Sequence, residues 1–151
     1  MHTHVSVEFL NQELYAIYKA LDQLIGERAW DVVWRSGEVL FDDLEKGLDI
    51  TETETLAVMK KIGDWFERSG YVDKIEFRMV ALDELEYDMY DPIIRASARR
   101  LISEGAAAPH FSTALMFAAL RKKCGLKAEM IGDPVLLPNG AGRERWKLIP
   151  A

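Results

Sequence analysis

The strongest constraint on the fold is a change in the spacing of apolar residues near the middle of the chain. The first 25 residues have helical spacing, with steps of three and four between Val7, Leu10, Leu14, Ile17, Leu21 and Leu24. From Ile75 onward the spacing becomes two, as in a half-buried strand. A chain with this change of period is expected to build helices first and a sheet afterwards.

Start and stop signals divide the first half into three helices. Gly26 is expected to end the first helix, and residues 27–46 form a second that stops at Gly47. In "TETE", Thr51 stands three residues before Glu54, which is the spacing of a capping box. The sequence therefore predicts a third helix that begins at Thr51.

The alternating stretch predicts a β-hairpin. Its first arm is apolar at every second position up to Ala81, and Leu85, Tyr87 and Met89 continue the same parity. If both arms share one buried face, Ala81 pairs with Leu85 across the three-residue loop 82–84.

The rest of the chain is expected to add two helices and about three strands. Asp91-Pro92 has the form of an N-cap followed by a first-turn proline, and residues 110–125 form a nearly all-apolar helix ended by Gly125. "LKAEMI" and two short segments around a Pro-Asn-Gly turn predict strands. The expected order is αααββααβββ, an α+β fold with N-terminal helices on one face of a mainly antiparallel sheet, in a single domain over residues 1–151.

Charge and composition exclude several classes of protein. The formal net charge is −6, and the basic run 121–123 is best interpreted as a helix C-terminus, so a nucleic-acid partner is not expected. The single cysteine, Cys124, excludes an internal disulfide and a cysteine-based zinc site. There is no signal-peptide pattern, and the longest apolar run, "ALMFAAL", is too short for a membrane span. We therefore expect a cytoplasmic protein.

Catalytic and metal-binding constellations are scarce. His2 and His4 form a His-x-His pair on an end expected to fray, without a third ligand, so no metal site is predicted. His110 opens an apolar helix and is first interpreted as a helix-terminal histidine bonded to backbone. Phosphate-loop, nucleophile-elbow and His-Glu-x-x-His motifs are absent from the sequence. Cys124 stands at the negative end of a helix and is expected to be unreactive.

The acidic residues of the hairpin are expected to lie on its solvated side. These are Glu76, Glu84, Glu86 and Asp88.

The large aromatic and methionine side chains are more informative about function than the polar residues. The chain has 4 tryptophans, 6 phenylalanines, 5 tyrosines and 6 methionines, spread over helices and strands alike. Most are expected to be core, but helices stacked on a modest sheet leave room for an apolar pocket. We expect such a pocket between the helix at 110–125 and the hairpin, lined by Trp34, Met59, Phe77, Met79, Tyr87, Met89, His110, Phe111 and Leu115.

Two segments resemble the 4-vinyl-reductase, or hydrocarbon-binding, domains. The C-terminal one is "SARRLISEGAAAPHFSTALMFAALRKKCGLKAEMIGDPVLLPNGAGRERWKLI", with a proline-led helix of small residues, a strand, a turn and a final aromatic-containing strand. The N-terminal one is "YAIYKALDQLIGERAWDVVWRSGEVL", where "RSGEVL" takes the place of the family's Gly-containing second helix. The resemblance covers nearly the whole chain.

The resemblance implies a binding protein. The family is related to the palmitate-carrying subunits of the TRAPP tethering complex and, more distantly, to haem-based nitric-oxide sensors. Its members bind small hydrophobic molecules and often dimerise through their N-terminal helices. The resemblance and the helical spacing together predict a homodimer interface at Val7, Leu10, Leu14, Ile17 and Leu21.

This chain departs from the family at its metal site. Many members have a cysteine where His110 stands and two more in the last strands, where this chain has Arg143 and Arg145. The resemblance therefore implies neither a family-type metal nor a haem. Three functions remain open: binding or sensing of a small hydrophobic ligand, a dimeric assembly module with a filled core, and an accessory role in tetrapyrrole vinyl reduction. No acid–base pair supports catalysis.

Overall fold

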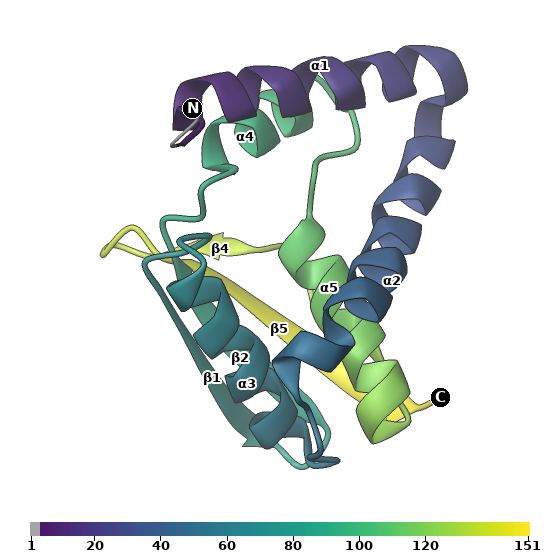
Figure 1. Ribbon diagram of the computed structural model, residues 1–151, viewed down its shortest axis with the longest axis vertical. Coiled ribbons are helices and arrows are strands. Elements are labelled where there is room, and N and C mark those ends of the chain that lie inside the picture. The colour runs from purple at the N-terminus through teal and green to yellow at the C-terminus, as the bar shows by residue number, and fades with distance from the viewer. Residues whose placement is uncertain (1–3) are drawn as a thin grey trace.

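The computed structural model describes residues 4–151, and its elements follow the predicted order. They are α1 (Val7–Ile25), α2 (Ala29–Leu48), α3 (Thr55–Arg68), β1 (Lys74–Ala81), β2 (Glu84–Tyr90), α4 (Arg95–Ser103), α5 (Phe111–Ala119), β3 (Leu126–Met130), β4 (Val135–Leu136) and β5 (Gly142–Pro150). The fold is α+β, as the change of period predicts (Figure 1).

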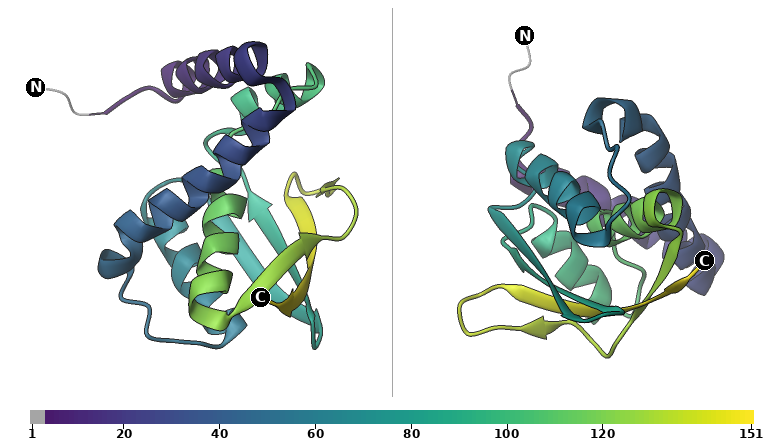
Figure 2. Two further views of the ribbon diagram at one scale, coloured as in Figure 1. Left: turned by 90° about the vertical axis from the view of Figure 1, so that its right-hand side faces the viewer. Right: turned by 90° about the horizontal axis from the view of Figure 1, so that it is seen from below.

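The strands form one antiparallel sheet in the order β1-β2-β5-β3, and β4 pairs with β5. All the described helices lie on one side of this sheet, and none of them covers its other face, which we call the bare face (Figure 2). The largest core fills the space between the sheet and helices α2, α3 and α5. Its fully buried side chains include Phe41, Ile62, Leu115 and Trp146.

A second, smaller core lies beneath α1 and α4, which form a layer of their own at one end of the molecule (Figure 1). A buried asparagine joins these two helices. Asn11 Nδ2 donates to the carbonyl oxygen of Ile93 (2.8 Å), and Asn11 Oδ1 accepts from the backbone N–H of Ser97 (2.9 Å). Because Ser97 lies in the first turn of α4, Asn11 caps that helix from another element.

Helices α2 and α5 lie side by side and touch almost backbone to backbone (Figures 1 and 2). A Cβ atom placed on Gly37 would lie 2.3 Å from the carbonyl carbon of Ala114 and 2.5 Å from its Cβ. No residue other than glycine fits Gly37 without separating the helices.

The predicted pairing of residues within the hairpin is wrong, although the apolar residues of both arms do share one face. The connection has two residues, Met79 pairs with Leu85, and Ala81 pairs with Glu84. A register shift between Met79 and Ala81 leaves Val80 as an extra, half-exposed residue. Val80 therefore forms a β-bulge. The connection is one residue shorter than predicted, and the bulge adds one residue to β1, so the apolar positions of both arms still face the helices.

Three predicted helix ends also differ from the structure. The carboxylate of Glu54, rather than Thr51, caps α3 by accepting from the backbone N–H groups of Leu56 and Ala57. Helix α2 continues through Gly47 and ends at Leu48, and its C-cap Asp49 has a left-handed φ of 50°.

Asp91 is not the N-cap of the fourth helix. It has a φ of 48°, and α4 begins only at Arg95, after a turn that contains Pro92. The predicted end at Gly125 is confirmed by its φ of 64°, although the last turn, Leu120–Cys124, widens into a π-helix.

The two glycines of α2 provide a direct test of the close helix contact. We expect Gly37→Ala to lower the free energy of unfolding by about 1–3 kcal/mol, because its methyl group forces α2 and α5 apart. Gly47→Ala, in the same helix but with open space around it, should leave stability unchanged or raise it by up to about 1 kcal/mol. Urea unfolding of both variants measures the difference, and equal effects would contradict the close contact.

Candidate ligand-binding site

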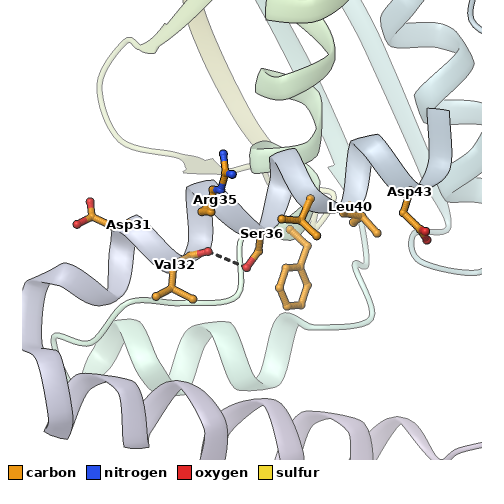
Figure 3. A pocket seen from close by; sticks show the side chains of 8 residues that line it. Asp31, Val32, Arg35, Ser36, Leu40 and Asp43 are labelled. Carbon is orange, nitrogen blue, oxygen red and sulfur yellow. Dashed lines mark hydrogen bonds between the residues drawn. The ribbon is translucent and has the colours of Figure 1, made fainter.

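An open groove of about 870 Å³ runs along α2 (Figure 3). It is lined by Asp31, Val32, Arg35, Ser36, Val39, Leu40, Asp43 and Phe111. All but Phe111 come from one helix, and Phe111 reaches it from the start of α5.

The groove exists because α2 is apolar on two sides. One side, with Val33, Gly37 and Phe41, is fully buried in the two cores. The other side carries Val32 and Val39, and no helix or strand of the described residues 4–151 is packed over the groove, so Val39 is 59% exposed. Exposed apolar side chains in a continuous groove make it the candidate site for an apolar ligand or partner surface.

Polar atoms in the groove are satisfied or lie at its ends. The hydroxyl of Ser36 donates to the carbonyl oxygen of Val32 in the preceding turn (2.7 Å), as Figure 3 shows. Arg35 forms an ion pair with Glu38, which lies outside the groove lining. The central wall is therefore apolar, and the charged side chains of the groove are those of Asp31, Arg35 and Asp43.

A second, smaller cavity is an aromatic recess of about 170 Å³ between α2, the start of α5 and the sheet. It is lined by Trp30, Trp34, His110, Thr113, Met130, Pro134 and Glu144. The ring of His110 stacks on Trp30 at 5.7 Å between centroids, Trp30 stacks on Trp34 at 6.1 Å, and Trp34 stacks on Phe117 at 5.5 Å. The aromatic wall of the recess is thus built by a continuous row of stacked rings.

The floor of this recess is polar. Glu144 lies on the helix-facing side of β5, and its Oε2 accepts a hydrogen bond from the Tyr87 hydroxyl. The same hydroxyl is 3.4 Å from Oγ1 of Thr113. Burial raises the pKa of Glu144 and of Tyr87, and burial lowers the pKa of His110. Each of the three groups is therefore shifted toward its uncharged form.

The residues predicted to line one pocket are divided among several places. Phe111 lines the groove, Trp34 and His110 line the recess, and Phe77 borders a cavity of about 260 Å³ beside α3. Met79 is partly buried against the main core. The remaining four are core side chains that line none of these cavities: Met59, Tyr87, Met89 and Leu115.

Sequence reasoning missed Val32, Val39, Trp30 and Glu144. For the groove, the available signal was that α2 is apolar over more of its circumference than one packed face needs. For Glu144 the signal was the alternation of side chains along a strand. Glu144 stands two residues before the buried Trp146, so both side chains lie on the same side of the strand.

The bare face of the sheet carries a network of charges that corrects another prediction. Glu86 and Asp88 are only 5% and 6% exposed rather than solvated. Arg143 donates two hydrogen bonds to Asp88 (2.7 and 2.9 Å), and Arg145 donates to Glu86 (2.7 Å). Arg78 bonds to both carboxylates from the neighbouring strand. The long arginine side chains cover the two acids, so the network stabilises the sheet.

Within residues 4–151, no group of three or more histidine, cysteine or acidic side chains is placed to hold a metal ion. His2, of the predicted His-x-His pair, lies outside the described residues. None of the described helices is long and apolar enough to cross a membrane.

The charge network predicts a specific loss of stability in acid. The hydrogen bonds from Arg143 lower the pKa of Asp88 to about 2, below the usual value of 3.8. Its contribution is therefore complete above pH ~4 and disappears as the pH falls toward 2. We expect Asp88→Asn to lose on the order of 1–2 kcal/mol at pH 7 and to approach the parent protein near pH 2–3.

Urea unfolding over this pH range measures the effect of Asp88. The exposed Asp133 provides the control, because Asp133→Asn should follow the parent protein at every pH. A constant difference between Asp88→Asn and the parent down to pH 2 would contradict the role given to ionised Asp88.

Comparison with known proteins does not identify a family for this chain. No protein-family model matches the sequence, and no curated protein matches it. The resemblance to hydrocarbon-binding domains therefore stays a prediction, and the function has to be argued from the groove and the recess.

Proposed function

We propose that this protein binds a small hydrophobic ligand in the groove of α2, as a homodimer and without catalysing a reaction on it. The observation that carries the proposal is the groove itself, about 870 Å³ with an apolar wall formed by Val32, Val39 and Leu40. Its volume is within the usual range for small-molecule sites. The apolar wall selects for a ligand with little charge.

The exposed apolar surface of α1 supports the dimer. Of the predicted interface residues, Leu14 and Leu21 pack against the smaller core and Leu10 is half-buried, whereas Val7 and Ile17 are 53% and 49% exposed. The available interface is therefore the exposed part of the predicted stripe, together with Leu24. A second copy packed on α1 would remove these side chains from water.

A dimeric assembly module is the second candidate. It is favoured by the complete burial of Met59 and Leu115 in the space where the ligand pocket was predicted. In that case the groove would receive an apolar surface of a partner protein rather than a small molecule. Native mass spectrometry followed by solvent extraction separates the two functions, because only the first gives a co-purified small molecule.

A charge in the groove should prevent ligand binding. We expect Val39→Asp to weaken the binding of the fluorescent probe 1-anilinonaphthalene-8-sulfonate by about tenfold or more, because the new carboxylate lies in the apolar wall and repels the anionic probe. Val135→Asp, at a similarly exposed valine outside the groove, controls for the added charge. Equal probe binding by both variants, or no binding by the parent protein, would contradict the proposed site.

The dimer is tested separately on α1. We expect Ile17→Asp to convert the dimer to a monomer in sedimentation velocity, because the variant places a charge in the apolar interface. Val80→Asp changes a similarly exposed side chain on β1 and should leave the dimer intact. A parent protein that sediments as a monomer, or an Ile17→Asp variant that remains dimeric, would rule out this interface.

A further inference from the structure

Within residues 4–151 the carboxyl group of the partly buried Glu144 forms no ion pair, which distinguishes it from Glu86 and Asp88, the buried acids of the sheet. Glu86 and Asp88, on the opposite face, are each bonded to two or more arginines. Glu144 pairs with β2 at Tyr87, and the bond it accepts comes from a neutral hydroxyl. Among residues 4–151, no lysine, arginine or histidine forms an ion pair with Glu144.

Burial of an unpaired carboxylate is costly, so such a group either stays protonated or binds a cation. Glu144 lines a cavity, and a cation could therefore reach it from outside the protein. The other lining residues are aromatic or apolar, apart from Thr113 and His110. Their low polarity strengthens the attraction between a bound cation and the carboxylate.

We propose that the aromatic recess binds a small primary amine, with the ammonium group of the ligand paired to Glu144 and its apolar body against Trp30 and Trp34. This site is separate from the α2 groove, and its occupancy does not depend on the function proposed for the groove. Its volume of about 170 Å³ limits the ligand to a compact molecule. For scale, a water molecule in the liquid occupies about 30 Å³.

The titratable groups around Glu144 do not oppose a cation. Tyr87 faces it from β2 and His110 from the start of α5, and burial shifts both toward their neutral forms. Helix α2 contributes Trp30 and Trp34, the last residue of β3 is Met130, and Pro134 lies in the segment that follows; none of these side chains titrates. Among the residues that line the recess, an ammonium ion would therefore meet one acidic group, Glu144, and no lysine or arginine, and burial favours the neutral form of His110.

Two ligands that differ only in their polar group test the proposal. Isothermal titration calorimetry at pH 7.5 compares benzylamine with benzyl alcohol as probes. We expect benzylamine to bind at least about tenfold more tightly, and its affinity to rise with pH as Glu144, whose pKa burial raises, loses its proton. The affinity for benzyl alcohol should change little with pH.

Three variants assign the effect to this recess. Glu144→Gln should remove the preference for benzylamine, whereas Glu129→Gln, an exposed acid on β3 with the same change in net charge, should keep it. Met130→Trp fills the recess from its other wall and should block both probes while Glu144 stays intact. Met130→Trp therefore tests the site even if Glu144→Gln is too unstable to assay.

Several results would overturn the amine site. These are equal affinity of the parent protein for the two probes, benzylamine binding that survives in folded Glu144→Gln or in Met130→Trp, and no benzylamine binding by the parent protein. Binding of benzyl alcohol alone would show that a neutral group, rather than an ammonium ion, is the partner of Glu144. Failure of probe binding in the groove would leave all these outcomes unchanged.

Discussion

The contact between Gly37 and Ala114 is the constraint on which the functional surfaces depend. With no side chain at Gly37, α2 approaches the backbone of α5 closely enough to share both cores with it. The close approach uses one side of α2 and places Trp34 where it can stack on Phe117 of α5. It also leaves the opposite side of α2, with Val39, exposed along the groove.

Helix α2 therefore separates two cavities of different chemistry. On one side the groove has a broad apolar wall and satisfied polar atoms, so it favours ligands or protein surfaces according to apolar area. On the other side the recess is narrow and ends at Glu144, so it favours ligands according to charge and size. A shift of α2 would change both cavities at once, because Val32 and Trp30 stand two residues apart on the same rigid helix.

The sequence predicts the order of elements well because that order follows from the period of apolar residues. It predicts element ends less well, because a cap depends on which of several nearby side chains reaches the free N–H groups, as Glu54 does in place of Thr51. The residues predicted to line one pocket border different cavities or the core, because a residue's polarity does not say whether neighbours fill the volume beside it. Leu115 and Phe111 are both apolar residues of α5, yet one is fully buried and the other lines a groove.

The acids on the two faces of the sheet have different partners, and this difference could not be predicted from the sequence. On the bare face, alternation along β5 places Arg143 and Arg145 opposite Asp88 and Glu86, so each buried acid meets a guanidinium. The same alternation puts Glu144 on the apolar face, where its neighbour across the strands is Tyr87. A carboxyl group there costs stability unless it is neutral or paired, and a core without function would be more stable with an apolar residue in its place. The proposed amine site gives this acid a role that the packing of the sheet does not provide.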